Sequence, residues 1–231
     1  MKKIYNYLNM SKNIQNNLRY ERKWIFNNTN YLDILNKALR SNFLFHLHFP
    51  KRYVNSLYFD DHNHTSVREN LYGIGNRTKF RIRWYGKNSF VLNNPKLEIK
   101  IKKNFLNYKR ILPLKSLNNL NLKNINHVKL ICSEVTNIIK KKLLIATVTT
   151  HYERLYLISS NKKVRATIDH KLKGTNFNCY FQNPIFKTCE DLIVEFKYKQ
   201  EYDNYVRGNI QKISSRFSKS SKYVYFALKN S

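Results

Sequence analysis

Several stretches of the chain alternate between apolar and polar residues, which is the pattern of β-strands with one buried face. The clearest stretches are 79–85 (KFRIRWY) and 96–102 (KLEIKIK). A turn is expected at 103–104, and 108–114 should return as a hairpin partner of the second stretch. A polar turn is expected at 60–64 (DDHNH), where Asp and Asn are ordinary turn residues. Further strands are expected at 19–26, 54–59, 147–159, 164–169 and 191–198.

Other segments have apolar residues at the spacing of a helix. Thr29 or Asn30 can cap a helix over 31–42. A second helix is expected near 127–142, and a shorter one within 208–226. The residues expected to share the buried face of the first helix are Leu32, Leu35 and Leu39.

The mixture of expected strands and helices, in a chain of this length, indicates one α+β domain. The chain has 231 residues, of which 42% are hydrophobic, so it can build a substantial core. Residues 1–17 are polar and rich in Asn, which predicts a poorly ordered N-terminal segment. The folded domain is therefore expected to span 18–228.

The cysteines and the hydropathy pattern indicate a cytoplasmic protein. The chain has 3 cysteines, Cys132, Cys179 and Cys189, and none of them forms a CxxC pair. This makes a disulfide framework or a cysteine zinc site improbable and favours a reducing compartment. No stretch approaches the roughly 18 consecutive apolar residues of a membrane span.

The charge balance narrows the range of partners. Lys and Arg number 43 against 14 Asp and Glu, which gives a formal net charge of +29. A compact body with this excess repels itself unless it meets an anion. Nucleic acid, an anionic membrane surface or a small polyanionic substrate would each fit. Because part of the Lys excess reflects a composition rich in both Lys and Asn, the placement of the charges is more informative than their number.

The charged residues of the expected strands share one face of each strand, because side chains two residues apart point the same way. An amphipathic sheet with a solvated charged side is the simplest interpretation of one such strand. Five strands with this pattern favour a closed antiparallel eight-stranded β-barrel tunnel, with a charged interior and an apolar exterior flanked by helices. The residues that share these faces are Lys79, Arg81, Arg83 and Tyr85; Glu98, Lys100 and Lys102; Tyr152 and Arg154; Arg165, Thr167 and Asp169; and Glu195 and Lys197.

A cationic interior needs an anion that can enter it, because converging positive charges raise one another's energy. A DNA duplex is too wide for an eight-stranded barrel, whereas a linear triphosphate or polyphosphate is slim enough. Arg offers a planar fork to phosphate oxygens, and Lys offers a point charge. The few carboxylates then fit as ligands of Mg²⁺ or Mn²⁺, hard ions that bridge carboxylate and phosphate.

Several segments together resemble a known family, the VTC (vacuolar transporter chaperone) polyphosphate polymerase domain. This domain belongs to the triphosphate tunnel metalloenzymes, the CYTH-like superfamily. The segments that carry the resemblance are 49–60 (FPKRYVNSLYFD), 76–86 (NRTKFRIRWYG), 97–100 (LEIK), 152–154 (YER), 164–169 (VRATID), 194–198 (VEFKY) and 221–223 (SKY).

The resemblance implies a metal-dependent transfer of the terminal phosphate of ATP onto a growing polyphosphate chain. It implies Mn²⁺ or Mg²⁺ as cofactor, with Glu195 and Glu98 as ligands. Lys219 also follows a serine and remains the alternative to Lys222 as the C-terminal tunnel lysine. The residues implied in phosphate binding and catalysis are Lys23, Arg81, Arg83, Lys100, Lys109, Arg154, Arg165 and Lys222, and those implied in substrate binding are Tyr152, Lys197 and Ser221.

Three alternatives share these features in part. A hydrolase of tripolyphosphate or of an organic triphosphate would use the same cations with water as the acceptor. A nucleic-acid-binding module would instead place basic and aromatic residues on an outer face, which the strand alternation does not favour. A non-catalytic polyphosphate-binding subunit is the third. We therefore expect ATP, polyphosphate and pyrophosphate as partners and no specific nucleic acid, and export of the product would need a separate membrane protein.

Overall fold

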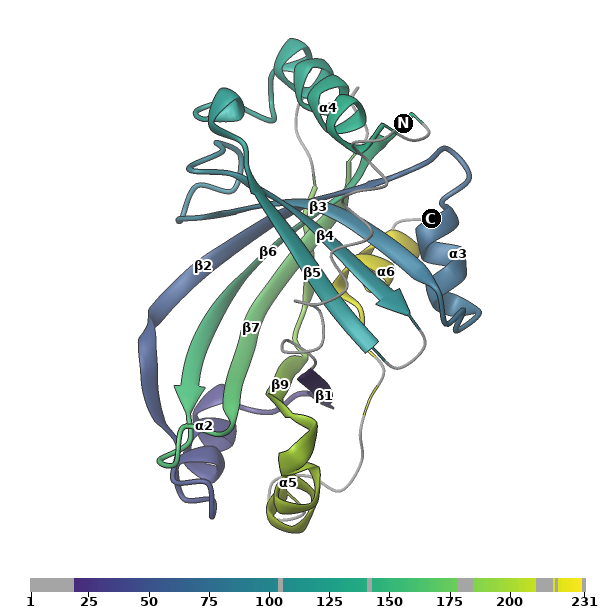
Figure 1. Cartoon of the computed structure of the whole chain (residues 1–231). Helices are drawn as coiled ribbons and strands as arrows, with labels where there is room; N and C mark the ends of the chain where they lie inside the picture. Colours follow the sequence, from purple (N-terminus) through teal and green to yellow (C-terminus); the bar gives the residue numbers. More distant parts are fainter. Residues whose placement is uncertain are drawn as a thin grey trace.

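The computed structural model describes residues 19–103, 106–140, 143–177, 185–210, 218 and 220–229. An antiparallel sheet forms its body and curls strongly on itself (Figure 1). Its strands are β1 (Arg19–Phe26), β2 (His46–Asp60), β3 (Arg77–Tyr85), β4 (Lys96–Lys103), β5 (Leu106–Pro113), β6 (Ile145–Ile158), β7 (Arg165–Asn176), β8 (Lys187–Cys189) and β9 (Leu192–Lys199). They follow the order β1-β9-β7-β6-β2-β3-β4-β5, and β8 pairs with β7. The disorder expected for 1–17 lies outside the described residues.

The sheet is an open half-barrel rather than the closed barrel expected from the sequence. Within the described residues, no backbone pairing joins β1 to β5, the strands at its two ends. A side-chain contact spans the gap instead, because Nζ of Lys100 on β4 lies 2.6 Å from Oε2 of Glu21 on β1. Alternation along a strand reports which face is buried, but it does not report whether the end strands approach closely enough to pair. The prediction of closure was therefore wrong, while the α+β class and the antiparallel order are confirmed.

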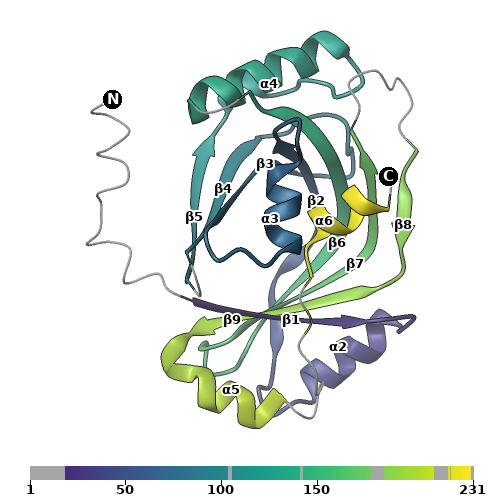
Figure 2. The same ribbon diagram turned by 90° about the vertical axis from the view of Figure 1, so that its right-hand side faces the viewer.

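Helices cover the outside of the sheet and also fill part of its inside. Their bounds are α2 (Tyr31–Leu39), α3 (Thr65–Leu71), α4 (Ile125–Ile139), α5 (Asp203–Ile210) and α6 (Lys222–Leu228). Figure 2 shows α4 on one outer side of the curled sheet, α2 and α5 on the opposite side, and α3 and α6 within its outline. In the described part of the chain, no helix is long and apolar enough to cross a membrane.

Two apolar cores lie between the outer helices and the sheet. Under α2 and α5, the ring of Trp24 on β1 packs edge-on against Phe196 on β9, with ring centroids 5.0 Å apart. Under α4, Trp84 on β3 is 1% exposed and lies in one cluster with Ile131 of the helix. The apolar side of each strand therefore faces outward into a helix-covered core, which leaves the charged side on the concave face.

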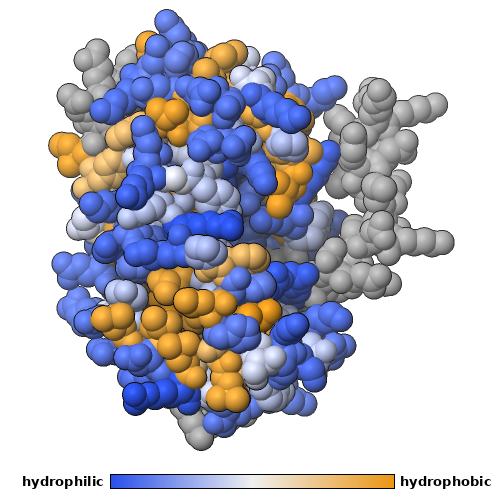
Figure 3. All heavy atoms as spheres, turned by 90° about the vertical axis from the view of Figure 1, so that its left-hand side faces the viewer, coloured by the Kyte–Doolittle hydropathy of each residue, from blue (hydrophilic) through white to orange (hydrophobic). Residues whose placement is uncertain are grey.

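Helix α2 buries a face that coincides only in part with the one that the leucine spacing predicted. Asn30 caps it, as expected, by accepting a hydrogen bond from the backbone N–H of Leu32. Its buried residues are Ile34 and Ala38, and Leu35 packs half-buried against the same core, whereas Leu32 is 47% and Leu39 37% exposed. Exposed apolar side chains gather in the lower half of Figure 3, where α2 and the start of β2 lie. The exposed apolar residues of these elements and the loop between them are Leu32, Leu39, Leu44, Leu47 and Phe49.

The polar segment 60–64 leads into helix α3, which the sequence analysis did not predict. The Asp60 carboxylate is buried and accepts hydrogen bonds from the backbone N–H groups of Ser66 and Val67 at the start of this helix. It also accepts a hydrogen bond of 2.7 Å from the hydroxyl of Tyr223 in α6. Asp60 therefore fixes both inner helices to the end of β2.

Candidate active site

Glu98 on β4 gathers cations from two neighbouring strands. Arg81 lies directly opposite it in the β3–β4 register, with Nη2 2.5 Å from Oε2. Arg83 approaches the same oxygen at 3.6 Å, and Nζ of Lys109 on β5 lies 3.0 Å from Oε1. Burial alone would raise the pKa of Glu98, but these three charges hold that pKa well below its usual range. The carboxylate is therefore ionised and keeps three cations in place.

Asp169 on β7 forms a second cluster on the same concave face. It is 0% exposed and binds the guanidinium of Arg154 through both oxygens, at 2.5 and 2.7 Å. Nζ of Lys222, the first residue of α6, lies 2.5 Å from Oδ2. Burial would raise the pKa of Asp169, but Arg154 and Lys222 hold it well below its usual range. A bidentate pair of this kind fixes the orientation of the arginine.

Tyr152 connects the first two clusters. Its ring is 1% exposed and lies under two cations, with Nζ of Lys222 at 4.7 Å and Cζ of Arg154 at 5.3 Å from the ring centroid. Its hydroxyl accepts a hydrogen bond of 3.4 Å from Nη2 of Arg83. Cations over an aromatic face gain from the ring quadrupole, so Tyr152 stabilises the cations of both clusters at once.

A third cluster joins the two ends of the sheet. Glu195 on β9 lies opposite Lys23 on β1, with Nζ at 3.8 Å, and Nζ of Lys197 lies 3.1 Å from its other oxygen. Burial would raise the pKa of Glu195, but Lys23 first and then Lys197 hold it well below its usual range. Across the gap, Lys100 binds Glu21 as described above. Burial lowers the pKa of Lys100 in spite of that pairing.

Two of the predicted residues lie apart from these clusters. Arg165 is exposed and has no ion pair among the described residues, although its register partner is Lys197. Ser221 accepts a hydrogen bond of 2.9 Å from Nζ of Lys79 rather than joining a carboxylate cluster. Lys219 lies outside the described residues. The other predicted site residues all converge on the concave face.

The sequence analysis did not select four residues that the structure brings into these contacts. Lys79 and Asp169 each share an alternating strand face with residues that were selected, and Glu21 lies two residues before Lys23. Their positions were therefore visible in the strand pattern, but their partners were not. The fourth is Tyr58 on β2, whose hydroxyl oxygen accepts a hydrogen bond of 3.1 Å from Nη1 of Arg81.

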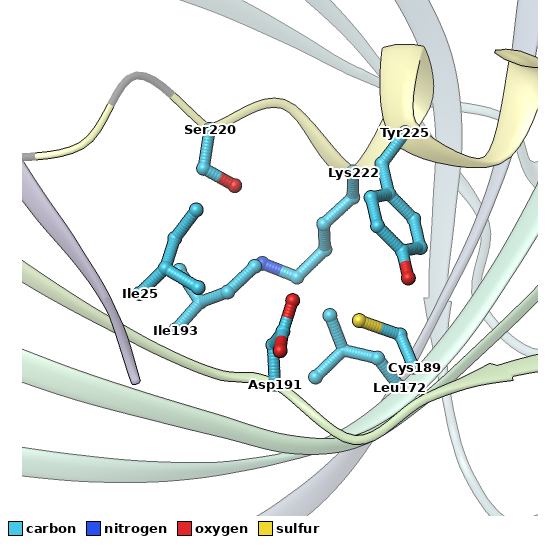
Figure 4. Close-up of a pocket in the computed structure, with 8 residues that line it drawn as sticks. All are labelled: Ile25, Leu172, Cys189, Asp191, Ile193, Ser220, Lys222 and Tyr225. Atoms are coloured by element: carbon cyan, nitrogen blue, oxygen red, sulfur yellow. The ribbon is translucent and has the colours of Figure 1, made fainter. Parts of the chain in front are cut away.

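Helix α6 fills one side of the concave face. Its residues Tyr223 and Val224 are buried in a cluster with Tyr58, Val148 and other inward side chains. Beside this helix lies a small pocket, shown in Figure 4, across which Lys222 extends from α6 toward the strands. Among the other residues that line it are Ile25, Leu172, Cys189, Ile193 and Ser220.

No group of three or more His, Cys, Asp or Glu side chains in the described part of the chain is arranged to hold a metal ion. Glu98 binds three cations, more than Glu195 with two or Glu21 with one, so it is the least available of these carboxylates to a metal. Glu21 and Glu195 lie on neighbouring strands close enough for their charges to interact. Mg²⁺ and Mn²⁺ commonly use one or two carboxylates together with phosphate oxygens, and this carboxylate pair fits that donor set.

A strongly curled antiparallel sheet with Arg, Lys and Glu on its concave face defines a protein of the triphosphate tunnel fold. A candidate adenylate cyclase from Vibrio parahaemolyticus superposes with a TM-score of 0.53 at 11% identity, covering 90% of this chain and 97% of that one. A second candidate adenylate cyclase, from Bacillus halodurans, superposes with a TM-score of 0.51 at 12% sequence identity, covering 87% of this chain and 92% of that one. The PH1819 protein from Pyrococcus horikoshii OT3 superposes with a TM-score of 0.51 at 8% sequence identity, covering 91% of this chain and 100% of that one. At these identities the likeness concerns the fold alone.

The chain belongs to the VTC domain family, whose model matches residues 18–227. This match covers nearly the whole chain and confirms the family that the sequence motifs indicated. No curated protein sequence gives a significant match.

Proposed function

We propose that this chain is a polyphosphate polymerase, which transfers the terminal phosphoryl group of ATP to a growing inorganic polyphosphate chain. The observation that carries the proposal is the convergence of Arg and Lys from separate strands on one concave face, where most of them pair with buried or half-buried carboxylates. The cations outnumber those carboxylates, so the face retains a positive charge that a phosphate chain can neutralise. The cations are Lys23, Lys79, Arg81, Arg83, Lys100, Lys109, Arg154, Lys197 and Lys222, and the carboxylates are Glu21, Glu98, Asp169 and Glu195.

The carboxylates serve to hold the cations in position before substrate binds. Arg81 and Arg154 each have a buried counter-charge, so their forks are oriented without a ligand. Preorganised charges need no rearrangement during the reaction, which is why they stabilise a transition state efficiently. In this proposal the predicted phosphate-binding residues contact the oxygens of the chain and of ATP, with Tyr152, Lys197 and Ser221 completing the substrate site. Arg165, which is exposed and opposite Lys197, would contact substrate at the edge of the face.

Phosphoryl transfer requires positioning and charge neutralisation more than a protein nucleophile. An oxygen of the terminal phosphate of the polyphosphate chain attacks the γ-phosphorus of ATP in line. The new P–O bond extends the polyphosphate by one unit, and the bond to the β,γ-bridging oxygen breaks, so that ADP leaves with that electron pair. The acceptor oxygen is already ionised, so no general base is needed.

Glu195, together with Glu21, is the proposed site of Mn²⁺ or Mg²⁺. A bound divalent ion would neutralise charge on the phosphoryl oxygens. The role of this chain's residues is to offer carboxylate oxygens next to Lys23 and Lys197, so that metal and ammonium groups bind the same phosphate chain.

The test is incubation of the purified chain with ATP, Mn²⁺ and a short polyphosphate primer, followed by a gel stained for polyphosphate and an assay for free orthophosphate. ATP-dependent growth of the primer supports the polymerase. Release of orthophosphate without growth of the primer would instead indicate a tripolyphosphatase or an organic triphosphatase that uses the same cations. Binding of the primer without any turnover of ATP would indicate a non-catalytic polyanion-binding module.

A further inference from the structure

Lys79 on β3 connects the concave face to both inner helices. Its Nζ donates to Oδ1 of Asn70 in α3 at 2.7 Å and to Oγ of Ser221, directly before α6, at 2.9 Å. All three side chains are half-buried. Both acceptors are neutral, so these bonds orient the ammonium without compensating its charge.

Within the described part of the chain, Lys79 forms no ion pair with a carboxylate. Its neighbours on the same face differ in this respect, because Arg81 binds Glu98 and Lys100 binds Glu21. A charge that is withdrawn from water and left without a partner is costly. The missing counter-charge is therefore expected to come from a ligand.

The electrostatic surroundings agree with this geometry. Burial first, and then the positive charges of Arg77, Lys23, Lys100 and Arg81, lowers the pKa of Lys79 to about 7. The ammonium therefore lies in the field of cations that the substrate would neutralise.

Hydrogen-bond donors remain around Lys79 after its own bonds are made. An ammonium has three N–H groups, and two of these are directed to Asn70 and Ser221. The amide N–H groups of Asn70 and the hydroxyl hydrogen of Ser221 have no acceptor among the described residues. An oxyanion that offers several acceptor oxygens, such as a phosphate group, matches these donors.

The position of Lys79 indicates which phosphate group it would bind. Nζ of Lys79 lies 6.0 Å from the ring centroid of Tyr223 in α6, and this ring belongs to a buried apolar cluster with Tyr58, Val148 and Val224. Figure 2 shows α3 and α6 within the outline of the sheet. A linear phosphate chain that lies along the cations cannot continue through this apolar cluster and would end beside Lys79.

We propose that Lys79, Asn70 and Ser221 form a subsite for the terminal phosphate group of a linear phosphate chain, either inorganic polyphosphate or a nucleoside triphosphate. The inference rests on the proposed function only in that phosphate chains bind the concave face. A terminal phosphate carries more charge and more free oxygens than an internal one, so this subsite would distinguish chains that have an end from rings that have none.

The test compares dissociation constants of the full chain for linear tripolyphosphate, ATP and cyclic trimetaphosphate, measured by titration calorimetry. Lys79→Met is expected to weaken tripolyphosphate binding by about tenfold or more, the size of one charged hydrogen bond, and trimetaphosphate binding by less than about twofold. Lys129→Met, which removes an exposed lysine from the outer helix α4, is the matched control and should change neither constant. If Lys79→Met loses affinity for ATP to the same extent, the subsite binds the γ-phosphate of a nucleotide. If it loses affinity only for tripolyphosphate, the subsite binds the end of the inorganic chain.

Equal weakening of the linear and cyclic ligands by Lys79→Met would overturn the proposal, because Lys79 would then contribute only to the general field. Thermal unfolding without ligand separates a structural role. Removal of an uncompensated ammonium should leave the variant at least as stable as the wild type, and a less stable variant with unchanged affinities would also overturn the proposal. If the wild type binds tripolyphosphate but makes no polymer, the proposed polymerase fails while the subsite stands. If the wild type binds no phosphate chain, both fail.

Discussion

Arg154 and Asp169 face each other across β6 and β7, and the guanidinium binds both oxygens of a carboxylate that is 0% exposed. The pair lies on the concave face, where Lys222 from α6 binds the same carboxylate. A buried charge on a strand is thus compensated by its neighbour in the sheet and by a helix far away in sequence. At Glu98 the compensating cations all come from the neighbouring strands β3 and β5, so here the sheet alone keeps the cations in place.

Substitution of Asp169 by Asn should destabilise the protein strongly. The change keeps the side-chain shape but leaves the guanidinium of Arg154 and the ammonium of Lys222 buried without their shared counter-charge. Breaking a buried pair by removing one partner costs about 3 kcal/mol or more, and chemical denaturation would measure the loss. Glu201→Gln, at an exposed carboxylate paired with Lys199, is the control and should change the free energy of unfolding very little. A similar small change for Asp169→Asn would show that the cluster does not contribute to stability.

Arg81→Ala and Arg83→Ala should reduce phosphoryl transfer by at least about a hundredfold, the usual effect of removing one preorganised charge stabiliser. The fold should survive either change, because Glu98 retains two of its three cations in each variant. Steady-state kinetics of ATP-dependent polymer formation, together with thermal unfolding, would check both statements. Arg40→Ala, at an exposed arginine next to α2, is the control for loss of one surface charge. Wild-type turnover in either tunnel variant would count against the assigned roles.

The charge of Lys79 should make phosphate binding depend on pH near neutrality. With a pKa of about 7 in the free protein, the side chain is charged below pH 7 and becomes neutral above it, so binding at pH 8 requires uptake of a proton. Affinity for tripolyphosphate should therefore fall as pH rises from 6.5 to 8.5, beyond the change due to the ligand itself. Lys79→Arg keeps its charge throughout this range and should flatten the profile. Identical profiles for the two proteins would exclude Lys79 as the titrating group.

The lowered pKa of Lys79 also predicts how the free energy of unfolding of the ligand-free protein depends on pH. The folded-state pKa of Lys79 lies below its usual value, so the unfolded chain binds more protons between about pH 7 and the ordinary lysine pKa near 10.4. The free energy of unfolding of the wild type should therefore rise over this interval relative to Lys79→Met. Denaturation curves at pH 6.5 and 9 would measure the difference, and its absence would indicate an unperturbed lysine.

The charged concave face could be predicted because it depends only on strand alternation. In 79–85 the apolar residues Phe80, Ile82 and Trp84 alternate with the charged ones, and the structure keeps the two sets on opposite sides. The register then places Arg81 opposite Glu98. The family motifs fall in these same strands, so the sequence indicated the antiparallel α+β fold, although not that the sheet is open, and the strand positions of most residues of the candidate site.

The features that were missed depend on contacts between distant parts of the chain. Helix α3 is short and mostly polar, and Asp60 at the end of the preceding strand holds its start. The buried face of α2 is set by what Ile34 meets in the core, since the helix has apolar residues on both faces. Likewise, Lys79 meets Ser221 across 142 positions of sequence, and no local pattern reports that contact.

Substitution of the two predicted metal ligands, Glu195 and Glu98, should have different consequences for metal binding. Glu195 lies near a second carboxylate, Glu21, whereas Glu98 is bound by three cations and has no such neighbour among the described residues. Glu195→Gln should therefore weaken binding of Mn²⁺ in the presence of tripolyphosphate by about tenfold or more, as expected for loss of a charged ligand. Glu98→Gln should leave the Mn²⁺ affinity within about twofold, because the carboxylate serves to position Arg81 and its neighbours. Electron paramagnetic resonance of Mn²⁺ measures this binding without relying on turnover. A weaker Mn²⁺ affinity in Glu98→Gln with an unchanged one in Glu195→Gln would reverse the assignment and move the metal to the β3–β4 side of the concave face.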